Sequence, residues 1–248
     1  MPSAYELTQM TWPEVEQALK TVKIAIIPLG AHEQHGPHLA ESCDAVLAEE
    51  MGRRLAERLY PEAIVTPTVN MGVSPHHLRF PGTLSLEPAT LLAILRDMTA
   101  SLKRHGICNV LVLNSHGGNQ AALAVASDTL PRELGVNFYY AKTTASAKDV
   151  MERRIESKLY GHSCEREVSE ALYLAPHLVR LDRLAKGDIR EGKWRKLRPG
   201  NPLQGYYYYE EMTGNGCIGD ATKASRELGE ELVETALDRL AEAVRDVL

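Results

Sequence analysis

Short apolar runs alternate along the chain with longer segments in which apolar residues recur at helical spacing. The runs are rich in β-branched residues, which is typical of buried parallel strands, and they cover 23–29, 63–69, 107–113 and 136–141. Apolar residues three or four apart predict amphipathic helices over 45–59, 88–105, 120–134, 163–174 and 225–248. We expect Pro131 to disturb the third of these helices and Asp44 to cap the first.

This alternation predicts an α/β fold with a mostly parallel central sheet covered by helices on both faces. Each helical crossover returns the chain in the same direction, so successive strands are parallel. The length of 248 residues fits one domain spanning 1–248. Residues 185–219 break the pattern, because they are rich in Gly, Pro, charge and Tyr. We expect an irregular insertion or hairpin over the functional site there.

Composition narrows the class of protein. The net charge is -5, so the chain lacks the positive field that drives binding to nucleic acid. No apolar run approaches the roughly 20 residues that cross a bilayer, and the first residues do not resemble a secretion signal. The four cysteines form no CxxC pair, which suits a reduced cytoplasm. We therefore expect a cytoplasmic protein that binds neither nucleic acid nor membrane.

Two polar loops follow predicted strands, and they carry the candidate chemistry. One is GAHEQHGPHL at 30–39 and the other is NSHGGN at 114–119. Ligand sites of open α/β sheets lie at the carboxyl ends of the strands, so these loops should meet in one crevice. Side chains two apart in an extended loop project to the same side, which brings Glu33 and His35 together, with Asp44 and His116 nearby. This nitrogen and oxygen ligand set predicts one or two divalent ions, Zn, Mn or Fe, rather than Ca or Mg.

Other motifs for this loop fail on spacing. His32 and His35 are three apart, and Gly36-Pro37 would break the helix that an HExxH zinc site requires. The chain has no GxSxG or P-loop pattern. We expect His32 and His38 to form hydrogen bonds or to support the ligands from behind.

A third polar cluster, GHSCEREVS at 161–169, opens the helix predicted over 163–174. His162 is a candidate acid or base toward a substrate, and Glu165 or Glu167 is a candidate further metal ligand. The two carboxylates lie about 200° apart around a helix, so both cannot face the same ion. Acidic residues in a first turn also complement the helix dipole without any other role.

With these clusters in hand, the sequence resembles the creatininase (creatinine amidohydrolase) family. Its first motif, close to PxGSxEQHGPHLPLxTD, corresponds to PLGAHEQHGPHLAESCD at 28–44. The match continues through MGVSPHHLRFPGT at 71–83 and NSHGGN at 114–119, and weakly at Gly219-Asp220.

The resemblance implies a metal-dependent amidohydrolase with a sandwich-like α/β subunit, often assembled as a homo-oligomer such as a hexamer. It also implies metal ligands at Glu33, His35, Asp44 and His116, with Asp44 as the bridge. Creatininases proper carry a Glu two residues beyond the equivalent of His116, whereas this chain has Gly118. Glu165 is therefore our candidate replacement ligand and, with His162, a candidate catalytic residue.

The expected function is hydrolysis of the C–N bond of a small cyclic amide or formylamide through a metal-activated water. The alternatives are a small cyclic ketone or lactone substrate at the same site, a nucleophilic Cys164 paired with His162, or a metal-binding module without catalysis. The segments 190–198 and 206–209 are expected to be a solvated loop and a strand-packing or subunit-contact segment, respectively.

Overall fold

The computed structural model describes residues 5–198 and 200–248 and contains one five-stranded sheet. In sheet order the strands are β1 (Tyr5–Glu6), β3 (Ala63–Val65), β2 (Ile24–Leu29), β4 (Asn109–Asn114) and β5 (Asn137–Lys142). Every neighbouring pair is parallel. The parallel sheet predicted from the sequence is confirmed, and the two-residue β1 is an addition to it.

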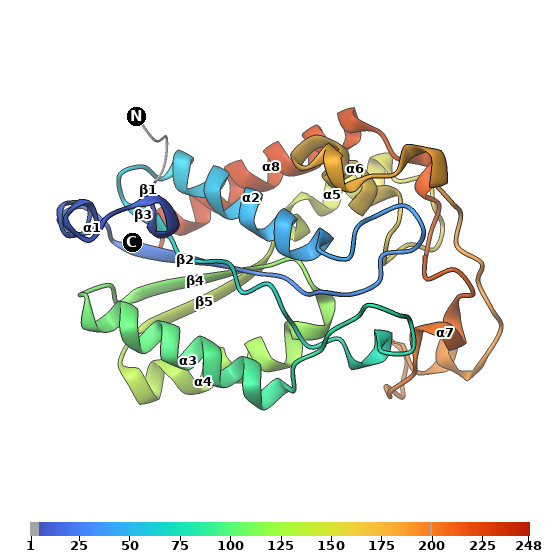
Figure 1. The fold of residues 1–248 in the computed structure, drawn as a ribbon, viewed down its shortest axis with the longest axis horizontal. Helices are drawn as coiled ribbons and strands as arrows, with labels where there is room; N and C mark the ends of the chain where they lie inside the picture. The colour runs from blue at the N-terminus through green and yellow to red at the C-terminus, as the bar shows by residue number, and fades with distance from the viewer. Residues whose placement is uncertain (1–4, 199) are drawn as a thin grey trace.

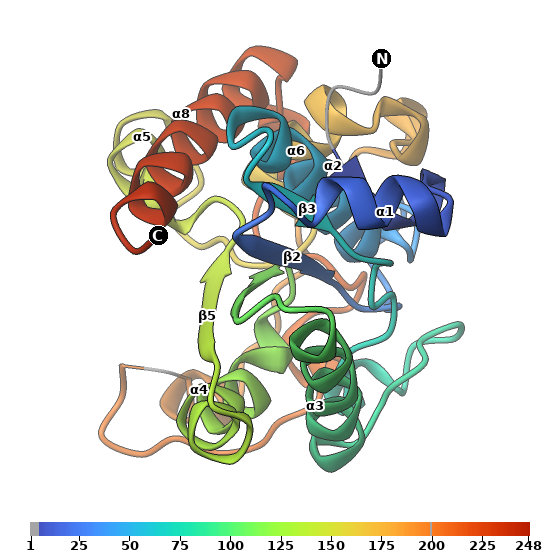
Figure 2. The same cartoon turned by 90° about the vertical axis from the view of Figure 1, so that its left-hand side faces the viewer.

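Helices cover both faces of the sheet (Figures 1 and 2). One face carries α2 (Cys43–Arg58), α5 (Lys148–Arg154), α6 (Glu165–Leu174) and α8 (Arg226–Arg245), and the other carries α3 (Pro88–Arg104) and α4 (Gln120–Leu134). The short helices α1 (Trp12–Ala18) and α7 (Tyr209–Met212) complete the α-helices of the described residues. None of the described helices combines the length and the apolar character that crossing a bilayer requires.

The expected effect of Pro131 on α4 is wrong. The helix continues past Pro131 to Leu134 and ends at Gly135, whose φ of 62° is the left-handed conformation of a helix end. A proline removes one backbone hydrogen bond. The burial of Leu123, Ala126 and Leu130 on this helix offsets that loss.

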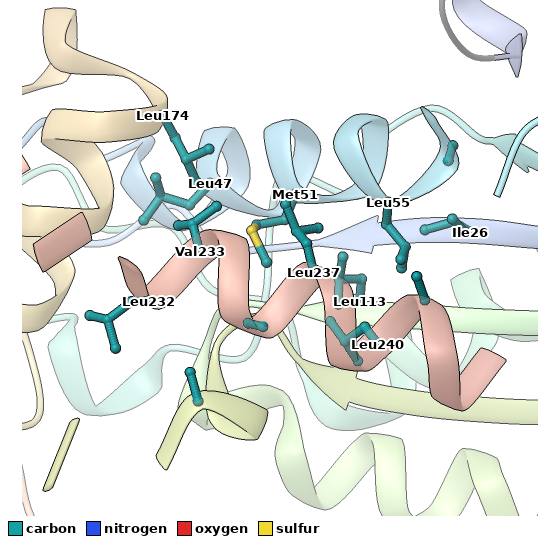
Figure 3. Packing of buried hydrophobic residues seen from close by; sticks show 14 of the residues in the cluster. Ile26, Leu47, Met51, Leu55, Leu113, Leu174, Leu232, Val233, Leu237 and Leu240 are labelled. Carbon is teal, nitrogen blue, oxygen red and sulfur yellow. The ribbon is translucent and has the colours of Figure 1, made fainter. Parts of the chain in front are cut away.

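Alternate residues of the central strands supply two separate cores. Ile24 and Ile26 of β2 pack with α2 and α8, whereas Ala25 and Ile27 pack with α3 and α4. This division follows from the two-residue period of a strand. Figure 3 shows the first core, in which Met51 and Leu55 of α2 point toward Leu237 and Leu240 of α8, with Ile26 and Leu113 of the sheet close by.

The backbone that connects β2 to α2 packs closely against the first turn of α2. A Cβ atom at Gly30 would lie 2.3 Å from the backbone nitrogen of Ala45, so only glycine fits there. Ser42 is the cap residue and Asp44 lies inside the first turn, which corrects the expected cap position of Asp44. The close approach holds the first turn of α2 beside the carboxyl end of β2.

The segment 185–219 contains turns, isolated bridges and the short helix α7. Trp194, Met212 and Ile218 form a small core of their own within it. In Figure 1 the segment with α7 lies beyond the same end of the sheet as the loops that leave β2 and β3.

Candidate metal centre

The register of the sheet brings the two predicted loops together. Leu29 at the end of β2 pairs with Asn114 at the end of β4, so Glu33 and His116 leave neighbouring strands at the same level. Oε1 of Glu33 lies 3.3 Å from Nδ1 of His116. The loops therefore converge as the sequence pattern predicts.

The protonation pattern of His116 is fixed by the backbone. Its Nε2 lies 3.0 Å from the carbonyl oxygen of Val73, to which it donates. Nδ1 is then left with a lone pair, and it lies 3.3 Å from Oε1 of Glu33 and 3.2 Å from Oδ2 of Asp44. A lone pair facing two carboxylate oxygens is stable only when a cation lies between them or a proton is added.

His35 repeats this arrangement with the opposite ring nitrogen. Nδ1 donates to the carbonyl oxygen of Glu33 at 2.9 Å, which leaves Nε2 free. Nε2 lies 3.5 Å from Oδ1 of Asp44 and 3.9 Å from Oε2 of Glu167. The two oxygens of Asp44 thus face two different histidines, as a bridging carboxylate would.

The buried carboxylates of the cluster favour a positive charge beside them. Burial alone would lower the pKa of His35, but the carboxylates of Asp44 and Glu167 raise it to about 10. Burial likewise opposes the charged form of His116, yet Glu33 and Asp44 hold the pKa of that imidazole well above its ordinary value. Protons on these rings and a divalent ion are alternative ways to balance the carboxylates.

The residues present fit a bound divalent ion. Within the described part of the chain, buried atoms without a hydrogen-bond partner include Oε2 of Glu33, Oδ2 of Asp44 and Nε2 of His35. Buried polar atoms are normally paired, so such a concentration needs a reason. The donor set of imidazoles and carboxylates suits Zn, Mn or Fe.

The structure does not bring Glu165 into this cluster. Its carboxylate accepts hydrogen bonds from the backbone nitrogens of Glu156 and Ser157, at 3.1 and 3.0 Å. Glu167 faces the cluster instead, and a carboxylate oxygen of Glu167 lies within 4.8 Å of a ring nitrogen of His35 and of His162. The expected ligand role of Glu165 is thus unsupported, because the first turn of α6 presents residue 167 to the crevice.

His162 lies where the sequence pattern places it. Its Nε2 donates to the carbonyl oxygen of Gln34 at 2.7 Å, which leaves Nδ1 with a lone pair 3.6 Å from Oε1 of Glu33. Burial, followed by the charge of His35, lowers the pKa of His162 to about 3. The ring is therefore neutral, and Nδ1 is a hydrogen-bond acceptor.

The sequence pattern did not single out His76, His77 and Tyr209. His77 accepts from the side-chain amide of Gln34 at 2.9 Å through Nδ1, so its Nε2 carries the proton and lies 3.5 Å from Oε1 of Glu33. The ring of Tyr209 packs on that of His77, with centroids 3.8 Å apart. The histidine pair was visible in the loop after the third strand, whereas Tyr209 comes from the irregular segment and contradicts the expected strand-packing role.

The remaining candidates are placed away from the centre. His38 donates to the carbonyl oxygen of Ser163 at 3.1 Å, and His32 lies beside Glu41. Cys164 is fully buried, and burial raises the pKa of its thiol. Trp194, in the basic segment 190–198, is buried and donates to the carbonyl oxygen of Arg190, so that segment is not a solvated loop throughout.

A cleft of about 800 Å³ opens onto the cluster. Glu33, Asp44, His116, His162 and Glu167 all line it. The irregular segment contributes further lining residues, namely Leu197, Gln204, Gly205, Tyr206, Tyr207 and Tyr209. The volume is typical of sites for small molecules.

The family model for creatinine amidohydrolase, termed Creatininase, matches residues 8–244. Creatinine amidohydrolase of Pseudomonas putida is 28% identical, covering 96% of this chain and 95% of that protein. The 3-dehydro-scyllo-inosose hydrolase of Thermotoga maritima is 27% identical, with coverages of 100% and 85%. The mycofactocin precursor peptide peptidase of Mycobacterium ulcerans is 28% identical, with coverages of 93% and 86%.

Solved creatininase structures are similar to this chain over almost its whole length. A crystal structure of creatinine amidohydrolase has a TM-score of 0.84 at 28% identity, covering 97% of this chain and 96% of that one. A creatininase described with Mn has a TM-score of 0.82 at 28% identity, with coverages of 98% and 98%. A mutant creatininase described as Zn-Zn type has a TM-score of 0.82 at 28% identity, with coverages of 97% and 97%.

Proposed function

Because the chain belongs to the creatininase family of hydrolases, we propose that it uses divalent metal to hydrolyse the C–N bond of a small cyclic amide or formylamide. One observation carries the metal part of the proposal. His35 and His116 each donate one ring hydrogen to a backbone carbonyl and turn the other nitrogen toward buried carboxylates. A hydrogen bond from the second ring nitrogen to a carbonyl oxygen is typical of metal-binding histidines.

Five residues would hold the metal in two positions. Glu33 and His116 belong to the first position, and His35 and Glu167 belong to the second. Asp44 faces both and is the proposed bridge. Divalent ions bound there supply a Lewis acid for the carbonyl oxygen and lower the pKa of water.

His162 is the proposed proton carrier. Its lone pair at Nδ1 borders the cleft and the cluster, so it can accept a hydrogen bond from the attacking water, and with its lowered pKa it holds the proton of that water only briefly. The same atom can then pass this proton to the departing nitrogen. Gln34 holds the ring in this orientation through its carbonyl oxygen.

Neighbouring side chains keep the ligands in place. Nε2–H of His77 points at Glu33, and the guanidinium of Arg166 lies 3.5 Å from the carboxylate of Glu167. Tyr209 is largely buried against the histidines and restricts the access of water to that side of the site. The cleft beside the cluster favours catalysis over a closed structural metal site, because a catalytic ion keeps a position open to substrate.

The proposal is tested by metal analysis together with a substrate screen. We expect Glu33→Gln and His116→Ala to lose metal and turnover with an unchanged circular dichroism spectrum, because both residues leave strand ends rather than the core. The wild-type protein is screened against cyclic amides, formylamides, lactones, cyclic ketones and short peptides. Full metal content and normal turnover in both variants would refute the metal site, and hydrolysis confined to lactones, ketones or peptides would refute the C–N substrate class.

A further inference from the structure

His76 lies at the metal centre, where the described residues give its ring nitrogens no hydrogen-bond partner. It occupies the short turn Pro75–His77, in the loop between β3 and α3, and it lines the cleft. Neither of its ring nitrogens forms a hydrogen bond with the described residues, whereas both nitrogens of His77 and His116 face defined partners. A histidine with both nitrogens free beside a carboxylate is available for coordination.

The geometry of His76 suits the first metal position. A ring nitrogen of His76, a ring nitrogen of His116 and a carboxylate oxygen of Glu33 all lie within 4.8 Å of one another. The rings of His76 and His116 are nearly parallel, with an interplanar angle of 11° and centroids 5.9 Å apart. Three donors at these separations can surround one ion with small side-chain movements.

Gly118 makes this approach possible. A Cβ atom at residue 118 would lie 2.1 Å from the carbonyl oxygen of Val73 and 2.4 Å from Nε2 of His116. It would also lie 3.0 Å from Cε1 of His76. Any side chain at 118 would therefore push the 73–76 segment away from the cluster. Residue 118, where creatininases proper carry a glutamate and this chain has glycine, is therefore adjacent to His76.

We propose that His76 is a direct ligand of the metal held by Glu33 and His116, in place of a side chain at residue 118. The proposal rests on the metal site described under Proposed function. With His76 included, the first position has two imidazoles, whereas the second has His35 as its imidazole and the carboxylates of Asp44 and Glu167. Imidazole favours Zn and Fe over harder ions such as Mn and Mg, so the first position should select the softer metal.

The test is a metal titration of His76→Ala in the full chain. The matched control is His177→Ala, because His177 also follows a proline in a short turn and is exposed. Binding of Zn²⁺ and Co²⁺ is measured by competition with a chromophoric chelator. We expect one of two ions to bind at least roughly tenfold more weakly in His76→Ala, since even residues that only orient a ligand are worth 10–100-fold. The control should bind both ions as the parent does.

A spectroscopic readout separates coordination from a structural effect. X-ray absorption of the Zn²⁺-loaded protein should show one imidazole fewer per two ions in His76→Ala than in the parent or the control. His76→Glu, which keeps a donor at this position, should recover more affinity for Mn²⁺ than for Zn²⁺. An unchanged imidazole count in His76→Ala would overturn the proposal. It would also be overturned if His76→Glu lost as much affinity as His76→Ala for both Mn²⁺ and Zn²⁺.

Glu33→Gln distinguishes this failure from that of the proposed function. If Glu33→Gln and His116→Ala both retain two ions with normal turnover, the metal site itself is refuted. If Glu33→Gln loses metal and His76→Ala binds both ions as tightly as the parent, only the role of His76 is refuted.

Discussion

The two halves of the metal centre are built from different kinds of structure. Glu33 and His116 follow neighbouring parallel strands, whose paired ends at Leu29 and Asn114 fix their separation. The other half joins His35 to Glu167, which lies in the first turn of α6, more than 100 residues further along the chain. Local sheet register therefore positions the first half, whereas the packing of a distant helix positions the second.

The halves also differ in how their ligands are restrained. The first half is held by backbone carbonyls and by His77, all from loops at the strand ends. In the second half, Oε2 of Glu167 accepts from the backbone nitrogen of Ser163 at 2.5 Å, and its other oxygen faces Arg166. Disturbing α6 should therefore affect one half and leave the other intact.

Asp44→Asn should have the largest effect, because Asp44 is the one side chain that both halves share. Its Oδ1 faces His35 and its Oδ2 faces His116. We expect the variant to lose both metal equivalents and at least about 100-fold in turnover, because even a residue that only orients a metal ligand contributes up to about 100-fold. Metal content and circular dichroism are measured together. Retention of one full equivalent would show that Asp44 belongs to a single half.

Two isosteric variants on α6 test whether the two halves bind metal independently. We expect Glu167→Gln to lose one equivalent and most activity, while the Glu33–His116 half keeps its ion. Glu165→Gln should keep both ions and lose about 1 kcal/mol of unfolding free energy, because it weakens one of the hydrogen bonds to the 156–157 segment. Metal titration and thermal unfolding distinguish the two variants. If Glu165→Gln loses an ion and Glu167→Gln keeps both, Glu165 is the metal ligand and the assignment of Glu167 is wrong.

The same contrast explains what the sequence could predict. The strand-end loops predicted that Glu33, His35 and His116 would converge, because parallel strands deliver their following residues to one edge, and Asp44 follows in the first turn of α2. The spacing of the two glutamates showed only that one of them can face the site. Which one does so depends on how α6 rotates against α8 and on the carboxylate contacts of Glu165, and neither is encoded in local periodicity.

The strand pattern also misled where strands were short. The strand predicted over 63–69 ends at Val65, although Val69 still forms an isolated bridge with Leu29, and the sequence pattern did not mark His76 and His77 in the following loop as candidates. Tyr209 was beyond prediction for a different reason. It reaches the cleft from a segment of turns, whose path is fixed by the packing of Trp194 with Met212 and not by a repeating pattern.

Cys164→Ser should have the smallest effect and tests whether α6 contributes any chemistry besides Glu167. The thiol is fully buried, and burial raises its pKa, so little thiolate is available as a nucleophile. Cys164 is not one of the described residues that line the cleft. A buried hydroxyl in its place costs up to about 2 kcal/mol of stability, so turnover is compared per folded molecule, and it should stay within about twofold of the parent. Loss of turnover with both ions retained would make the cysteine a nucleophile, and α6 would then supply the reaction as well as the ligand.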